Sequence, residues 1–196
     1  MVKNQIQEER MKGYFIQATK EILRSEGLRL ISVRNIADKA GYSYATMYNY
    51  FKDVKDLVFE CVQDFLQECD EFIIDEVKGI EPGIERVRAI NKAYIKYFVQ
   101  YPGIFELFYI EKTTDLAHKQ PTIETIDRFL GEITKQDWQV AIDAKLVEAE
   151  GAELLQEQIK FFVIGVLITY MNRLVNSNYH DIMNMIDKHL SYMLDM

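Results

Sequence analysis

The sequence has few of the residues that interrupt helices. Its 196 residues include only three prolines and nine glycines. Long segments without either residue favour helices, and no run of alternating polar and apolar residues predicts a strand. Apolar residues make up 48 % of the chain, which is enough for a core. We therefore expect an all-α fold of about nine helices.

Cysteine and histidine are also scarce. His118, His180 and His189 do not have the spacing of a metal site, and the chain has no GxSxG, phosphate loop or Glu-x-x-His pair. We expect no catalytic residues, no metal and no cofactor. On one helix Cys61 and Cys69 would lie about 12 Å apart along the axis, too far for a disulfide. We interpret both as small core residues, and a redox switch is the alternative.

The sequence has no apolar leader and no long hydrophobic run. Its N-terminus, MVKNQIQEERMKG, is polar, and the most apolar run, residues 161–168, is eight residues long. A membrane span needs about 20 residues. These features predict a soluble, cytoplasmic protein with no membrane partner.

Charge is divided unevenly along the chain. The formal net charge of −8 argues by itself against binding to nucleic acid. However, residues 1–60 carry ten Lys/Arg and eight Asp/Glu, whereas residues 61–196 carry thirteen and twenty-three. A slightly basic N-terminal part on an acidic body leaves room for a DNA-binding head.

Two short helical patterns, residues 33–40 and 44–51, have the proportions of a helix-turn-helix. Ser32 and Ser43 are predicted N-caps, and Gly41 suits the left-handed turn between the helices. We expect Tyr42, Met47 and Phe51 to point inward. The side chains left to face outward carry hydroxyl or amide groups or are small, and such groups contact phosphates and base edges.

The segment SVRNIADKAGYSYATMYNYFKDVKDLV, within residues 14–58, resembles the DNA-binding domain of the TetR family of transcriptional regulators. The matching residues are Ser32, Val33, Arg34, Ile36, Ala37, Ala40, Gly41, Ser43, Thr46, Tyr48, Tyr50, Phe51 and Leu57. The sequence departs from the family pattern at Tyr42, Ala45 and Val54. At Val54 the family usually has a phosphate-contacting lysine, and Lys52 or Lys55 could replace it.

The resemblance implies a helix-turn-helix DNA-binding domain over residues 1–53 and a helical ligand-binding and dimerisation domain over residues 54–196. It also implies a homodimer on a pseudo-palindromic operator of double-stranded DNA. The predicted DNA-binding residues are Ser32, Arg34, Ser43, Tyr44, Ala45, Thr46, Tyr48, Asn49, Tyr50, Lys52 and Lys55. Among them Tyr44, Ala45, Thr46 and Asn49 are expected to approach the bases.

Aromatic residues in the C-terminal part are candidates for a ligand pocket, although their helical spacing fits an ordinary core equally well. The candidates are Phe65, Cys69, Tyr94, Phe98, Phe105, Phe108, Trp138 and Phe162. So many rings favour an apolar or aromatic small-molecule effector. The excess of carboxylates leaves a cationic effector open.

The segment FFVIGVLITY, residues 161–170, is apolar on all sides, which predicts that a partner covers one side. The predicted dimer interface comprises Phe161, Ile164, Leu167, Ile168, Met171, Ile182, Ile186, Leu190 and Met193. The alternative is a helix buried inside a monomer. The resemblance to the TetR family implies a ligand-released repressor. The alternatives are an activator, a regulator controlled by a protein partner and, remotely, a helical-bundle enzyme.

Overall fold

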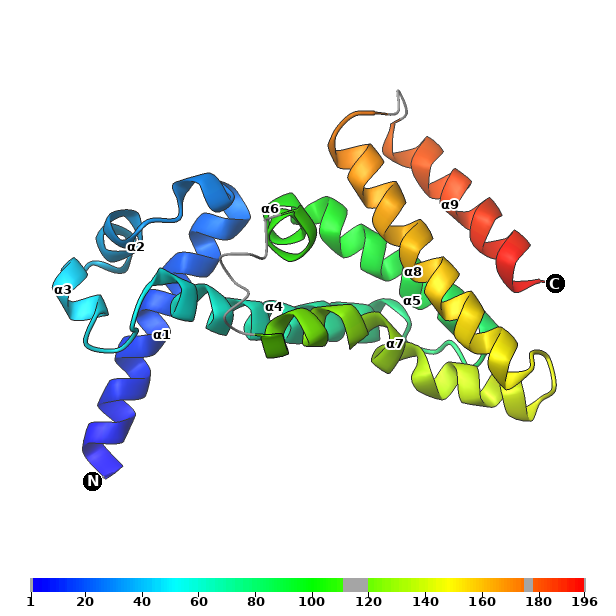
Figure 1. Cartoon of the computed structure of the whole chain (residues 1–196), viewed down its shortest axis with the longest axis horizontal. Coiled ribbons are helices and arrows are strands. Elements are labelled where there is room, and N and C mark those ends of the chain that lie inside the picture. The colour runs from blue at the N-terminus through cyan, green and yellow to red at the C-terminus, as the bar shows by residue number, and fades with distance from the viewer. Residues whose placement is uncertain (1, 111–119, 175–177, 196) are drawn as a thin grey trace. The chain divides into compact units, whose positions relative to one another are not determined.

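The computed structural model describes residues 2–110, 120–174 and 178–195, and every regular element in these ranges is helical (Figure 1). The chain divides into two compact units. The head unit comprises Met1–Gln67 and Tyr101–Ile126, and the body unit comprises Glu68–Gln100 and Asp127–Met196. The described residues form nine α-helices, which confirms the predicted all-α class. The predicted domain boundary at residues 53/54 stays a prediction.

The head unit contains three N-terminal helices and a second set of short elements. These are α1 (Val2–Ser25), η1 (Leu28–Leu30), α2 (Val33–Ala40), α3 (Tyr44–Met47), α6 (Pro102–Phe105) and the π-helical turn η2 (Glu106–Ile110). Two further helices, α4 (Val54–Glu76) and α7 (Gln120–Asp143), begin in the head unit and end in the body unit.

The predicted caps define α2 and α3. The Ser32 hydroxyl accepts a hydrogen bond from the backbone N–H of Asn35 at 3.1 Å, and the Ser43 hydroxyl accepts one from the backbone N–H of Thr46 at 3.1 Å. Between the helices Gly41 has φ 76°, a left-handed conformation that suits glycine. Helix α3 is a single turn, shorter than the predicted 44–51, because tighter bonds follow it: the Tyr50 amide donates to the Met47 carbonyl at 3.0 Å.

A shared apolar cluster holds the head together. It comprises Phe15, Ile22, Ile36, Met47, Phe51 and Leu57, all buried, from α1, α2, α3, the turn that follows it and α4. Tyr42 lies over α1, with its ring centroid 5.8 Å from those of Tyr14 and Phe15, yet 38 % of it stays exposed. The expectation that Tyr42 points inward is therefore only partly right.

The C-terminal end of α1 packs against α4 and α6. Lys20 forms a 2.8 Å ion pair with Asp64, and the Arg24 guanidinium lies over the rings of Phe65 and Tyr101. Helix α6 approaches so closely that a β-carbon on Gly103 would overlap the Leu23 carbonyl oxygen. Glycine is needed here for space rather than for its backbone angle.

The body unit is built around α5 (Ile84–Gln100), which packs against α8 (Ala149–Met171) and α9 (Tyr179–Leu194). Its buried residues include Val87, Ile90, Tyr94, Tyr97 and Phe98. At its start the Gly83 amide donates to the buried Asp137 carboxylate at 3.1 Å. Along its length Lys96 pairs with Glu76 at 2.6 Å, Lys92 pairs with Asp187 at 2.6 Å, and Arg88 pairs with Asp195.

The close contact between α1 and α6 yields a stability prediction. Gly103→Ala should lower the free energy of unfolding by about 1–3 kcal/mol, because backbone atoms cannot move aside as a flexible side chain would. Gly131→Ala is the matched control: it lies inside α7 with no heavy atom within 4 Å of the added β-carbon, and should gain about 1 kcal/mol from helix propensity. Thermal or urea denaturation measures both, and changes of the same sign and size would contradict the prediction.

Candidate functional site

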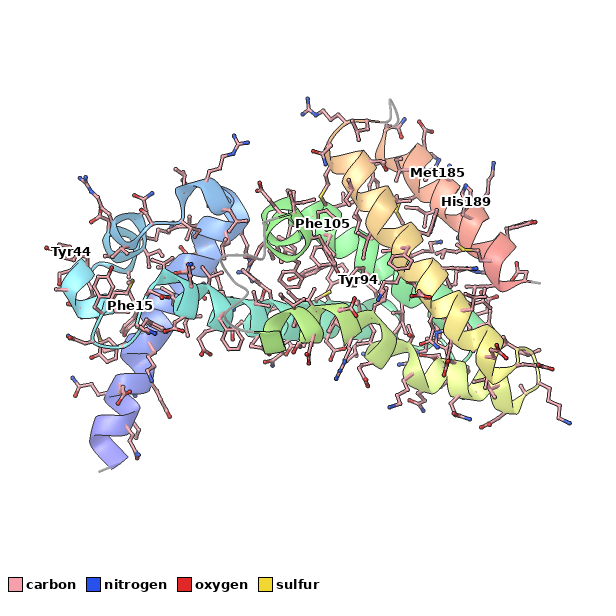
Figure 2. The ribbon with its side chains drawn as sticks, viewed as in Figure 1. Phe15, Tyr44, Tyr94, Phe105, Met185 and His189 are labelled. Carbon is pink, nitrogen blue, oxygen red and sulfur yellow. The ribbon has the colours of Figure 1, made fainter. Side chains whose placement is uncertain are left out.

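The α2–turn–α3 segment presents a polar, ring-rich face to solvent. Tyr44 is 65 % exposed and Tyr48 is 51 % exposed, whereas Met47 between them is completely buried. Figure 2 shows Tyr44 at the outer end of α3 and Phe15 on α1 in the interior of the head. One turn of helix therefore separates a packing side from a side free to meet a partner.

The eleven residues predicted to bind DNA all lie in the head unit. Nine are exposed, namely Ser32, Arg34, Ser43, Tyr44, Ala45, Tyr48, Asn49, Lys52 and Lys55, and Thr46 and Tyr50 are half-buried. The Tyr50 ring is 6.4 Å from that of Phe15, so it helps to hold the segment on α1. None of the eleven is enclosed in the core, although their contacts with DNA stay a prediction.

Several of these polar groups already have partners. The Ser43 and Thr46 hydroxyl oxygens lie 2.9 Å apart, and the Ser43 hydroxyl also caps α3. Arg34 lies 3.9 Å from Asp38 but its side chain is 89 % exposed, so the pair is weak. In contrast, the side-chain amide of Asn49 has no hydrogen bond to the described part of the chain. The side chains most available to a partner are therefore Tyr44, Tyr48 and Asn49.

Charges next to the helix-turn-helix are partly compensated. Lys39 on α2 reaches Glu21 on α1 at 3.2 Å. Hydrogen bonds from Gln17 and from Lys39 lower the pKa of the Glu21 carboxyl, so this carboxyl stays ionised and offsets Lys39. Lys52 and Lys55 are exposed on either side of the start of α4, where a phosphate-binding group is expected.

The residues predicted to line an effector pocket are mostly buried in the core. Phe65, Phe105 and Phe108 lie in the head unit, whereas Cys69, Tyr94, Phe98, Trp138 and Phe162 lie in the body unit. Only Phe162 is half-buried, and the other seven are buried. Their contact with an effector stays a prediction, and the spacing argument could not separate it from core packing.

The body unit contains an open groove of about 480 Å³. Its lining residues come from α5, α7 and α8, and Trp138 is the one sequence candidate among them. The other lining residues are Asn91, Asp127, Arg128, Leu130, Gly131, Glu132, Thr134, Lys135, Glu153, Gln156, Glu157, Ile159 and Lys160. Sequence analysis missed them because most are polar residues and they are spread over three separate helices. Within the described ranges no three His, Cys, Asp or Glu side chains gather as a metal site.

The predicted dimer residues divide into two groups. Leu167, Ile182, Ile186 and Leu190 are buried in the core of the body unit, so they are covered before any partner binds. Phe161 is 62 % exposed, and Ile164, Ile168, Met171 and Met193 are half-buried. Tyr192 on α9, which sequence analysis missed, is 81 % exposed. Met185 and His189 also lie on α9 (Figure 2). The candidate interface therefore narrows to the outer side of α8 and α9.

Helix α8 is long enough and apolar enough to cross a membrane, judged by length and composition alone. Of its most apolar window, 22 % is buried inside the chain. Core helices of soluble proteins pass the same test, so this is weak evidence for a membrane span. A helix with these properties also suits burial against a partner chain.

Residues 15–61 match the family model of the bacterial regulatory proteins of the tetR family. No curated protein matches the chain. Many solved structures share the fold, and three of them are described. The regulator FadR from Bacillus subtilis, in complex with stearoyl-CoA, is 16 % identical with a TM-score of 0.70, over 92 % of this chain and 96 % of its own.

The second structure is a TetR-family transcription regulator from Marinobacter aquaeolei, 17 % identical with a TM-score of 0.67, over 97 % of this chain and 98 % of its own. The third is RolR in complex with resorcinol, 16 % identical with a TM-score of 0.67, over 96 % of this chain and 89 % of its own. Identities this low establish the fold alone.

The two cysteines yield a prediction about reactivity. Burial raises the pKa of both thiols, Cys61 and Cys69, and the thiolate is the reactive form. The native protein should therefore leave both thiols unmodified by a disulfide reagent in mildly alkaline buffer, and unfolding in guanidinium should expose two per chain. Rapid modification of the native protein would instead favour the redox switch.

Proposed function

We propose that this chain, whose residues 15–61 belong to the TetR family of bacterial regulatory proteins and whose fold is that of the family, is a cytoplasmic repressor that binds operator DNA. The observation that carries the proposal is the exposed face of α3 and of the turn that follows it. This face exposes Tyr44, Tyr48 and Asn49, whereas Met47 and Phe51 are buried. Exposed amide and hydroxyl groups are suited to base edges and phosphates.

The proposed operator is a pseudo-palindrome bound by a homodimer. A single helix-turn-helix reads only one half-site, and two copies read half-sites about one helical turn, roughly 34–36 Å, or more apart. Support for the dimer comes from Phe161, Tyr192 and the half-buried apolar residues beside them on α8 and α9. Their exposure in a lone chain would leave an apolar surface in water.

We infer that a small-molecule effector releases the DNA. The FadR and RolR structures hold stearoyl-CoA and resorcinol, so the same fold accommodates quite different molecules in those proteins. An effector acts only through a difference in affinity between DNA-bound and released states. Helix α4 connects the two units as one continuous helix over Val54–Glu76, which makes it the candidate element that carries the change.

An activator, or a regulator controlled by a protein partner, is the second candidate, because a helix-turn-helix can serve in repressors and in activators. Reporter transcription with and without the protein separates repression from activation. A helical-bundle enzyme is the remote alternative, and gel-shift binding to DNA that flanks the protein's own gene separates it from a DNA-binding regulator.

The first test of the proposal concerns base recognition. Asn49→Ala should raise the Kd for the operator about tenfold, since a good side-chain contact to a base is worth about 1–3 kcal/mol. Gln63→Ala, which removes an exposed amide on α4 outside the helix-turn-helix, should leave the Kd unchanged. Gel shifts on a footprinted operator measure both. If Asn49→Ala keeps both the affinity and the sequence preference, Asn49 does not read bases.

Phosphate binding by the basic residues has its own measurement. Operator affinity should fall as salt concentration rises, and Lys52→Ala should reduce the slope of log K against log salt by about one. Lys55→Ala provides the comparison, because either lysine is a candidate replacement for the one missing at Val54. A salt dependence that neither substitution changes would contradict this role for both lysines.

The dimer is tested at Phe161, whose side chain points away from the chain's own core. Phe161→Glu should dissociate the dimer, because it would bury an unpaired charge at the interface, a cost of several kcal/mol. Leu146→Glu is the control, since Leu146 is 67 % exposed on the turn that follows α7. Light scattering at micromolar concentration should give twice 23.1 kDa for the wild type and the control. A monomeric wild type would contradict the proposal.

A further inference from the structure

The groove between α7 and α8 combines an apolar floor with charged walls. Leu130, Trp138 and Ile159 line it and are buried, and the buried Asn91 of α5 also lines it. The charged lining residues are Asp127, Arg128, Glu132 and Lys135 of α7 and Glu153, Glu157 and Lys160 of α8. The polar groups differ in whether they already have partners, and that difference indicates which ligand would fit.

Asn91 carries an unsatisfied acceptor. It is 1 % exposed, and its amide nitrogen donates to the Val87 carbonyl oxygen at 2.8 Å. Its amide oxygen is fully buried and accepts no hydrogen bond from the described part of the chain. A buried acceptor without a donor is costly, and buried polar groups are nearly always paired. A ligand that brings an N–H or O–H group to this oxygen would remove the cost.

The charged groups indicate the sign of the ligand. Lys160 pairs with Asp127 across the groove at 2.9 Å, and Lys135 lies 3.9 Å from Glu132, so these two cations have carboxylates nearby. Arg128, the third cation that lines the groove, also has an interaction partner. Glu153 and Glu157, four residues apart on α8, form no ion pair with the residues that the structure describes. The unpaired charge in the groove is therefore negative, and like charges four residues apart on a helix repel each other.

Both observations point to the same chemical class. A protonated amine supplies N–H donors for the Asn91 oxygen and positive charge for Glu153 and Glu157. The apolar floor with Trp138 suits a ring or a short hydrocarbon attached to that amine. A carboxylate ligand would add negative charge beside Glu153 and Glu157 and would offer no donor to Asn91.

We propose that the α7–α8 groove binds small organic amines in their protonated form, with an aromatic or hydrocarbon body on the floor beside Trp138. Binding itself needs only the groove. The role of such an amine as the effector rests on the proposed function. In this proposal residues of α5, α7 and α8 bind the amine, and the groove selects its ligand by charge.

The test is calorimetric titration of the full chain with 2-phenylethylamine and with 3-phenylpropanoate, which is similar in size and opposite in charge. We expect the amine to bind and the carboxylate not to bind. Stearoyl-CoA is titrated as a third probe, because the FadR structure contains it. Failure of the amine to bind, or binding of either anionic probe in this groove in preference to the amine, would overturn the assignment.

Three variants locate the binding. Asn91→Leu, which removes the orphan oxygen but keeps the number and branching of the side-chain heavy atoms, should raise the Kd of the amine about tenfold or more. The double variant Glu153→Gln/Glu157→Gln should raise it too and, being on the surface, tests the groove even if the Asn91 variant folds poorly. Glu150→Gln, which removes a carboxylate from α8 outside the groove, should change nothing. Amine binding that none of these substitutions alters would overturn the proposal.

The effector role is measured separately, by gel shift with and without 2-phenylethylamine. Loss of operator binding in the wild type, but not in the double variant, would support it. Amine binding without any effect on operator affinity would overturn the effector role and leave the binding site standing. A chain that binds the amine and no DNA would contradict the proposed repressor while the groove assignment holds.

Discussion

The head depends on one constraint: its helices α2 and α3 are too short to be stable alone. Helix α2 has eight residues and α3 has four, whereas isolated helices shorter than about 12–15 residues are marginal in water. They persist because Ile36, Met47 and Phe51 join Phe15 in one buried cluster. The exposed positions of Tyr44 and Tyr48 follow from this arrangement, since the buried Met47 between them fixes which side of the turn faces inward.

The same constraint explains why the head could be predicted in detail. Ser32, Gly41 and Ser43 act through local backbone geometry, so their roles were evident from sequence and the structure confirms them. The predicted end of α3 was wrong because no local sequence pattern distinguishes a continued α-helix from the tighter turn that forms at Tyr50. The partial exposure of Tyr42 was missed because it depends on how far Tyr14 and Phe15 extend from another helix.

In the body the periodicity identified helices but not their surroundings. Ile186 and Leu190 of α9 were predicted to lie in the dimer interface, yet both are buried in the chain's own core. A segment that is apolar on all sides, such as residues 161–170 of α8, predicts that two surfaces cover it but does not show which side each surface covers. The groove was unpredictable for a related reason: Asn91, Glu153 and Glu157 have no common pattern until α5 and α8 are folded beside α7.

The proposed dimer also bears on whether a ligand in the α7–α8 groove could control DNA binding. A ligand at 100 times its Kd that binds only the released state favours that state by about 2.7 kcal/mol. Reversing an equilibrium from 1:99 to 99:1 takes about 5.5 kcal/mol. One groove would therefore supply about half of the required free energy, and two grooves in a symmetric dimer would supply nearly all of it. In this scheme the apolar face of α8 and α9 does more than bring two recognition helices together, because it also couples two modest binding events to one release of DNA.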